Sequence, residues 1–326
     1  SITTHQTALR KFNSPAVKKY FEIRRQTPSL IFKWEHYIDR LWEIGSQQGV
    51  EFSFNTEVKA PLLKDNICLG LRLENGTEIF GRTTLACDGH SSPLGKAAGI
   101  DYRAMNCPIV KSLRSEFKAE YSGFEFFFIA QGQLPDAPQF PPAVVFVFPR
   151  GSGLCEVGLM VFRSTAAKLK RFWIMPDEKE IHRVWLKLIE TYPRFSELMR
   201  HTTVEFEHVT SIPCAKMHKT AMIRPGLICI GDSVGFVEAS GASGILAAMK
   251  SARFVATFLS QNARSAWTTQ SQAQFNIAFQ ESSIYKRINK LYRMVLPVLN
   301  FVFAGLRTPE KINNYWFLVK LFYKLV

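Results

Sequence analysis

The stretch that most constrains this chain is GLICIGDSVGFVEASGASGILAA, which spans residues 226–248. Its apolar, partly β-branched run Leu227–Ile230 predicts a strand buried on both faces, and Gly231 ends that strand without a side chain. The small residues at 240–243 let backbone N–H groups approach a ligand, and a helix starting at Gly244 directs its positive end towards it. The pattern predicts a cofactor seat at the end of a buried strand.

The helix itself is predicted from the spacing of the apolar residues that follow, as far as about residue 260. These residues recur at helical intervals and indicate an amphipathic helix: Ile245, Met249, Ala252, Ala256 and Leu259.

A second strand with a similar end is predicted about 140 residues earlier in the chain. Thr84–Cys87 is followed by Asp88 and Gly89, and then by small polar residues. Two buried strands thus each end at a glycine beside an aspartate. Asp-Gly is also a common turn pair, so turns in an ordinary α/β domain are the alternative.

Composition indicates a globular chain of about two domains, since 326 residues with 47% hydrophobic and 21% charged side chains can bury a large core. The net charge of +14 predicts attraction to an anionic membrane, nucleic acid or a phosphorylated substrate. No recognised nucleic-acid-binding module accompanies the charge, so we expect no nucleic-acid partner.

The six cysteines never form a C-x-x-C pair, and most lie in apolar runs, which predicts buried free thiols. No zinc-ligand spacing is present, so we expect no metal. The polar start of the chain predicts a cytoplasmic protein, and the apolar stretch 291–306 is too short to span a bilayer.

Between the two strand ends the sequence changes character. The apolar runs 125–129, 143–148 and 156–162 are joined by Gly/Pro turns, as in an antiparallel sheet. Nearer the start, a helix is predicted at 35–49 and a strand at 50–55. The expected domains are a cofactor domain in two parts, an inserted sheet domain and a basic helical end: 1–105 and 209–262, 106–208, and 263–326.

Three motifs in order resemble one family. ACDGHSSPLGKAAGI (86–100) resembles its Asp-Gly segment, VFVFPRGSGLCEVGLMV (145–161) resembles its sheet segment, and the motif from Ile230 resembles its G-D-A-A-G-F-V-x-P-x-x-G-x-G-I. The family is that of the FAD-dependent oxidoreductases that include geranylgeranyl reductases and FixC-like quinone reductases. Flavin monooxygenases and halogenases are more distant members.

The resemblance implies an α/β fold: an incomplete FAD/NAD(P)-binding Rossmann-like domain, interrupted by an antiparallel β-sheet substrate domain, with a helical C-terminus. It implies that Asp232 accepts hydrogen bonds from ribitol or ribose hydroxyls of FAD, and that Gly244 and Ile245 face the flavin N1–C2=O edge. The implied cofactor-binding residues are Asp88, Gly89, Gly231, Asp232, Gly235, Gly241, Ala242, Ser243, Gly244 and Ile245.

The family's G-x-G-x-x-G fingerprint is absent from residues 1–60, and its first βαβ unit is expected to precede residue 1. The chain is then either a fragment of a longer protein or a degenerate relative that cannot hold the adenosine half of FAD. Within the second motif, Ala239 replaces a proline, Ala242 a glycine and Ser243 a glutamate.

A lipid-like substrate is expected from two features. Phe126, Phe128, Phe146 and Phe148 alternate with other apolar residues and line either a long apolar pocket or an ordinary core. In 283–326, basic and aromatic residues interleave with one acid, which predicts either an interfacial helix pair on anionic lipid or a basic cap on the core.

The expected function is an FAD-dependent oxidoreductase that saturates double bonds of an isoprenoid or other polyene lipid with hydride from reduced flavin. Its electron donor would be a nicotinamide or a ferredoxin. A flavin monooxygenase or halogenase is the first alternative, although FWIMP (172–176) only faintly resembles the halogenase W-x-W-x-I-P segment. A flavin-free remnant that acts as a binding or membrane-associated module is the second.

Overall fold

The computed structural model describes residues 3–5, 8–14, 17–25, 29–31, 34–118, 123–129, 131–132, 134, 136–163, 174–238, 243–262, 266–297 and 317–318. The chain divides into two compact units. Unit 1 comprises Ser1–Ser53, Pro108–Thr210 and Leu299–Val326, and unit 2 comprises Phe54–Cys107 and Ser211–Val298.

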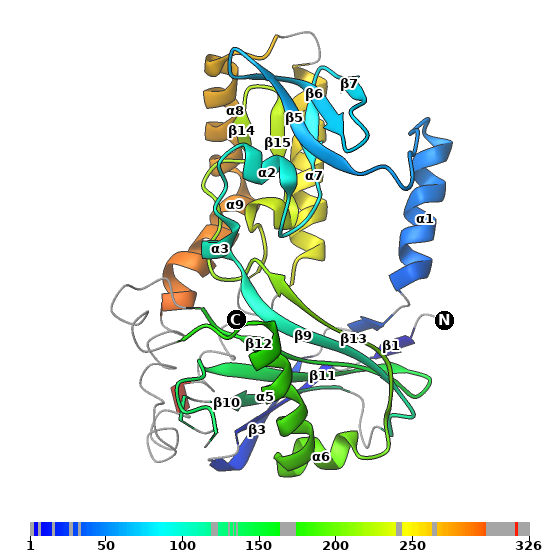
Figure 1. Ribbon diagram of the computed structural model, residues 1–326, viewed down its shortest axis with the longest axis vertical. Coiled ribbons are helices and arrows are strands. Elements are labelled where there is room, and N and C mark those ends of the chain that lie inside the picture. The colour runs from blue at the N-terminus through cyan, green and yellow to red at the C-terminus, as the bar shows by residue number, and fades with distance from the viewer. Residues whose placement is uncertain are drawn as a thin grey trace. The chain divides into compact units, whose positions relative to one another are not determined.

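Unit 1 is built on a seven-stranded sheet of order β13-β9-β12-β11-β10-β2-β3 (Figure 1). The pairs from β9 to β10 are antiparallel, as the sequence predicts, while β10 pairs in parallel with β2. Its strands are β2 (Ala8–Ser14), β3 (Val17–Arg25), β9 (Cys107–Ser115), β10 (Gly123–Ile129), β11 (Ala143–Gly151), β12 (Leu154–Val161) and β13 (Thr203–Ile212). A separate pair joins β1 (Thr3–His5) to β4 (Ser29–Ile31).

Helices α5 (Glu178–Thr191) and α6 (Pro193–Met199) cover one face of this sheet (Figure 1). Asp177 caps α5 by accepting a hydrogen bond from the N–H of Glu180, and Pro193 begins the next helix. Trp185 and Phe195 are fully buried, with ring centroids 5.4 Å apart. Their burial against β10, β11 and β12 forms the core of unit 1.

A charged cluster is buried beside α5. The Glu207 carboxylate accepts hydrogen bonds from Trp185 Nε1 at 2.9 Å and from His182 Nε2 at 3.0 Å, and Arg114 Nη2 lies 3.5 Å away. Burial raises the pKa of Glu207, but these hydrogen bonds and the Arg114 charge outweigh it, so the pKa is lowered from its ordinary value. The ionised form of Glu207 is therefore part of the folded structure.

Because the folded pKa of Glu207 is lowered, its contribution is present above the unfolded pKa of about 4.3 and is lost as pH falls through the folded pKa. We predict that Glu207→Gln lowers the free energy of unfolding at pH 7 by about 3–5 kcal/mol, since it leaves the buried Arg114 charge unpaired. The difference from wild type should shrink below about pH 4. Urea unfolding between pH 7 and pH 3 measures this, with exposed Glu190→Gln as the control; equal effects of the two variants would contradict it.

Unit 2 contains two three-stranded sheets and the helices that follow the two strand ends (Figure 1). One sheet is antiparallel, with β5 (Val58–Lys64), β6 (Ile67–Leu73) and β7 (Glu78–Phe80). The other has the order β14-β15-β8, with β8 (Thr84–Ala86), β14 (Met222–Arg224) and β15 (Leu227–Cys229). The helices are α2 (Pro93–Ala97), α3 (Tyr102–Met105), η1 (Gly231–Val234), α7 (Ile245–Gln261), α8 (Thr269–Glu281), α9 (Ser283–Lys290) and the π-helical η2 (Leu291–Val295).

The apolar core of unit 2 gathers around β15, whose three residues are fully buried. Phe275 and Phe279 of α8 lie in the same core, and Phe254 of α7 packs against both rings. Together with the helical end, these sheets give the mixed α/β class that the sequence predicts.

Helix α7 forms where the sequence predicts it, but its buried face is different. The expected apolar stripe is largely exposed, with Ile245 at 47% and Met249 at 53%, whereas Ala247, Ser251 and Val255 are buried. Periodicity identifies the helix, but smaller residues on the opposite face are the ones buried in unit 2.

Two further expectations differ from the structure. Residues 50–55 form no strand, because Phe52 folds back against Gly45 and Asn55 adopts a left-handed conformation with φ of 53°. Helix α1 (Trp34–Gln47) forms as predicted, yet Ser1–Ser53 belongs to unit 1, although the sequence predicts it to be part of the cofactor domain. Strand pairing is the reason, since β2 lies beside β10.

Five of the cysteines are buried free thiols, as predicted, and the sixth, Cys87, is exposed. Within the described part of the chain, no helix is both long and apolar enough to cross a membrane.

Candidate functional site

The two strand ends singled out in the sequence lie side by side in unit 2. Strands β8 and β15 pair in parallel, with Ala86 opposite Cys229, and the Ile230 N–H donates to the Ala86 carbonyl at 3.1 Å. Carboxyl ends of parallel strands share one edge of a sheet, so Asp88 and Asp232 follow strand ends at the same edge. This juxtaposition joins segments far apart in the sequence.

A buried serine fastens the two strand ends together. Ser233, in η1, is fully buried, and its hydroxyl lies 2.8 Å from the Ala86 carbonyl and 2.7 Å from the Ile230 carbonyl. Tyr102 of α3 donates its phenolic hydrogen to the Ser233 carbonyl at 2.6 Å. Burial raises the pKa of the Tyr102 phenol, which keeps it a donor.

The Asp88 end is ordered by a second serine. Ser92 is fully buried, donates to Asp88 Oδ2 at 2.7 Å and accepts from the Gly95 N–H at 2.8 Å, which caps α2. A side chain at Gly95 would place its Cβ 2.0 Å from the Tyr102 hydroxyl, so only glycine fits there. Asp88 itself is exposed and thus fixes the turn while remaining accessible.

Asp232 lies beside the start of α7. A Cβ on Gly244 would be 2.9 Å from Asp232 Oδ1, and one on Gly231 would be 3.2 Å from the Ala248 Cβ. Among the described residues, no side chain caps the N-terminus of α7. The helix therefore presents its positive end next to a carboxylate that is half-exposed.

The other expected cofactor residues have different settings. Gly235 is buried with a left-handed φ of 66°, and a Cβ there would lie 2.6 Å from the Lys216 carbonyl, so it shapes the turn after η1. Gly89, with φ of 83°, has open space around it. Ser243 is exposed and bridges to Glu238 through two backbone hydrogen bonds. Gly241 and Ala242 lie outside the described residues.

The expected substrate-pocket phenylalanines lie on one face of the unit 1 sheet, opposite to α5 and α6. Phe126 is paired with Phe146 across β10 and β11, and Phe148 contacts both rings at centroid distances of 5.6 and 4.8 Å. Phe128 lies two residues further along the same face, whereas Phe127 points to the helices and meets Phe195. Phe126, Phe146 and Phe148 therefore form one aromatic cluster.

Gly158 makes room for this cluster. It pairs with Phe146 across β11 and β12, and a Cβ there would lie 2.5 Å from the Phe146 ring. The ring can therefore lie flat over the strand.

Within the described part of the chain, no three His, Cys, Asp or Glu side chains come together as a metal site. Burial and the neighbouring Asp88 charge raise the pKa of the Cys229 thiol to about 12, so this cysteine stays protonated and is no nucleophile. The arrangement is suited to binding a ligand between a carboxylate and a helix N-terminus. It is not suited to catalysis by Cys229 as a nucleophile.

Comparisons with known proteins place the fold among known enzymes. No protein-family model matches the chain. It is 21% identical over 242 residues to the digeranylgeranylglycerophospholipid reductase of Haloferax volcanii, an alignment that covers 71% of this chain. The chain spans only 55% of the length of that reductase.

Solved structures give the same answer for the fold. A geranylgeranyl bacteriochlorophyll reductase-like protein from Thermoplasma acidophilum superposes with a TM-score of 0.69 at 15% identity, covering 98% of this chain and 82% of the other. A flavin-dependent brominase gives 0.62 at 12% identity over 98% and 77%, and a myxobacterial chondrochloren halogenase gives 0.55 at 15% over 97% and 66%. The chain has the fold of the flavin-dependent reductases and halogenases. The similarity of sequence motifs noted above is therefore matched by similarity of structure.

Sequence reasoning missed the buried residues that hold the two strand ends together. Ser233 and Tyr102 are separated by 131 positions, and only the structure brings them into contact. The only signal in the sequence was the serine that directly follows the Gly-Asp pair. The motif alone does not show whether such a serine is buried or lies in a solvated turn.

We predict that Ser233→Ala lowers the free energy of unfolding by about 1–3 kcal/mol, because it removes the buried hydroxyl donor from the Ile230 and Ala86 carbonyls, of which Ala86 keeps a backbone donor, the Ile230 N–H. Exposed Ser260 makes a similar hydrogen bond to the Thr257 carbonyl at 2.8 Å, and Ser260→Ala should change stability by less than about 0.5 kcal/mol. Urea unfolding followed by circular dichroism compares the two. Indistinguishable midpoints would show that the Ser233 bridge contributes nothing.

Proposed function

We propose that this protein is an FAD-dependent oxidoreductase that reduces carbon–carbon double bonds of an isoprenoid or other lipid. The observation that carries the proposal is the position of Asp232, at the end of a buried parallel strand and directly beside the start of α7. The fold similarity to a geranylgeranyl reductase-like protein and the similarity to the Haloferax reductase support it.

The described residues fit the flavin half of the cofactor. In our proposal Asp232 accepts hydrogen bonds from ribityl or ribose hydroxyls, and the N–H groups of Gly244 and Ile245 favour negative charge at the edge of the flavin. The missing side chain of Gly244 leaves space next to Asp232 Oδ1. Bound FAD supplies the hydride chemistry, while the chain orients the cofactor and excludes water.

The adenosine half requires a dinucleotide-binding βαβ unit, whose fingerprint residues 1–60 lack. Unit 2 exposes large apolar side chains where such a unit would pack: Leu85 at 44%, Ile245 at 47%, Leu246 at 54% and Met249 at 53%. We propose this surface as the place where it packs, since exposed apolar residues gathered at one strand and one helix start favour a covering partner.

For the substrate we propose the aromatic face of the unit 1 sheet. The rings of Phe126, Phe146 and Phe148 offer an apolar surface of the kind that a polyene chain requires. The donor of electrons to the flavin would be a nicotinamide or a ferredoxin, as in the family that the sequence resembles.

One observation favours a flavin monooxygenase or halogenase as the second candidate. Lys111 pairs with Gly158, which pairs with Phe146, so this half-buried lysine lies on the aromatic face. In halogenases a lysine is expected between flavin and substrate. The flavin-dependent brominase and the chondrochloren halogenase share the fold.

One assay tests the proposed reaction. The full gene product, loaded with FAD and reduced anaerobically with dithionite, is given a geranylgeranyl lipid, and mass spectrometry should find a gain of two hydrogens per double bond. Products that contain oxygen or halide after exposure to air would instead establish the second candidate. A protein that retains no flavin and leaves the lipid unchanged would instead support the flavin-free binding module.

We predict that Asp232→Ala in the full gene product lowers FAD affinity about 10- to 100-fold, which corresponds to one charge-assisted hydrogen bond of about 1.5–3 kcal/mol. Its unfolding midpoint should stay unchanged, because Asp232 is half-exposed and outside the apolar core. Flavin fluorescence titration measures this. Glu57→Ala, at an exposed acid of the same unit, is the control. Unchanged flavin occupancy would sink the assignment.

We also propose attraction to an anionic membrane surface. Helix α9 buries Tyr285 and Ile288 in the core and exposes Lys286, Arg287 and Lys290, so its described part can contribute charge but has no free apolar face to insert. Most of the basic residues beyond it lie outside the described residues.

Replacing Lys286 and Lys290 together by glutamine should therefore weaken sedimentation with phosphatidylserine vesicles at low salt, by about 1 kcal/mol per charge. Binding of the wild type should decline as salt rises. Replacing the exposed Lys64 and Lys96 is the matched control, since it removes the same charge from elsewhere in unit 2. A wild-type protein that ignores the vesicles would contradict this prediction.

A further inference from the structure

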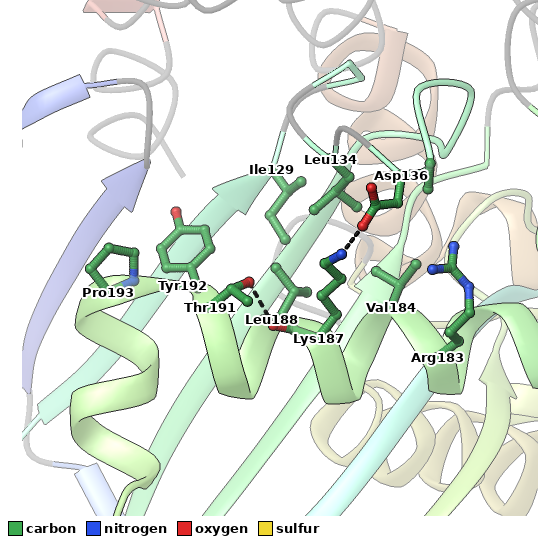
Figure 2. Close-up of a pocket in the computed structure, with 11 residues that line it drawn as sticks. Ile129, Leu134, Asp136, Arg183, Val184, Lys187, Leu188, Thr191, Tyr192 and Pro193 are labelled. Atoms are coloured by element: carbon green, nitrogen blue, oxygen red, sulfur yellow. Dashed lines mark hydrogen bonds and ion pairs between the residues drawn. The ribbon is translucent and has the colours of Figure 1, made fainter.

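Unit 1 contains a cavity that plays no part in the proposed function. It lies between α5 and the residues Leu134, Asp136 and Ala137, with a volume of about 180 Å³ (Figure 2). Its wall is mostly apolar and is made by Ile129, Leu134, Ala137, Val184, Leu188 and Tyr192.

The cavity is on the opposite side of the sheet from the aromatic face. Ile129 shares its side of β10 with Phe127, which packs against α6, whereas Phe126 and Phe128 point the other way. A molecule in this cavity would therefore not occupy the surface proposed for the lipid substrate.

The apolar wall is held in place before any ligand arrives. Val184 and Leu188 are buried with α5 in the core of unit 1, and the Tyr192 ring meets Phe127 edge-on at 5.6 Å. The buried Tyr192 hydroxyl has no hydrogen-bond partner among the residues that the structure describes. An unmatched buried hydroxyl is the kind of group that a bound ligand or water satisfies.

A lysine stands at the rim. Lys187 lines the cavity and pairs with Asp136, and their side chains are 46% and 50% exposed (Figure 2). A pair this exposed is weak, so another carboxylate can replace Asp136 with little loss. Arg183, the other cation at the cavity, already makes hydrogen bonds of 2.8 and 2.9 Å with Glu180, which leaves Lys187 as the accessible charge.

We propose that this cavity is a binding site for a short-chain carboxylate, with the hydrocarbon chain along Ile129 and Leu188 and the carboxylate at Lys187. The apolar wall would contact the hydrocarbon chain. The carboxylate would take the place of Asp136 in the ion pair with Lys187. A ligand of about ten heavy atoms that fills such a cavity binds in about the millimolar range.

Octanoate and octanol serve as probes in calorimetric titrations of the full chain, because they share a chain and differ in charge. Octanoate should bind saturably, and Lys187→Gln should weaken it about tenfold without affecting octanol. Asp136→Asn should strengthen octanoate binding several-fold, because it removes the competing carboxylate. Lys179→Gln, an exposed lysine of the same helix that does not line the cavity, is the matched control.

A filled cavity provides the second test. Ala137→Phe should abolish binding of both probes while the unfolding midpoint stays near that of wild type. If Ala137→Phe does not fold, Leu134→Trp serves as the cavity-filling variant. Absence of saturable octanoate binding to the wild type at 10–20 mM (roughly ten times the expected Kd) would overturn the proposal. Equal effects of Lys187→Gln and Lys179→Gln would also overturn it. None of these readouts depends on flavin.

Discussion

The parallel pairing of β8 with β15 is the constraint on which the candidate site depends. It places two chain reversals, one at Asp88 and one at Asp232, at one edge of a sheet. A three-residue parallel pair is short, and the Ser233 hydroxyl and the Tyr102 phenol add hydrogen bonds across it where water cannot compete. Glycines then occupy the points where η1 and α2 approach their neighbours too closely for a side chain.

Sequence patterns predicted much of this arrangement because the relevant signals are local. A short apolar run that ends at glycine indicates a buried strand, and apolar recurrence indicates the helix from Ile245. The sequence could not predict which strand or helix each of these elements packs against. Strand β2 was missed because basic residues interrupt its apolar alternation, and its pairing with β10 joins segments more than 100 residues apart. The stretch at 50–55 shows the converse, since alternation without a partner strand produced only an extended connection.

Helix α7 illustrates the same limit. Its spacing predicted a helix and an apolar stripe, yet Ala247, Ser251 and Val255 are the residues buried in unit 2. Small side chains allow a closer approach of the helix than Ile245 or Met249 would. The larger residues are left on the outside, where they either contact a further part of the protein or remain an unusual apolar surface. Periodicity alone therefore predicts the helix but not which of its faces is buried.

The two faces of the unit 1 sheet separate two kinds of binding surface. On one face, α5 and α6 bury the odd-numbered residues of β10, and the charged cluster around Glu207 closes over the edge of that core. On the other, Phe148 meets Phe126 edge-on and Phe146 at a tilt, beside a glycine that leaves room for the Phe146 ring. Because alternation along each strand fixes which residues belong to which face, a single substitution changes only one of them. The aromatic face and the cavity beside Lys187 can therefore be altered independently, which makes each of them a separate experimental question.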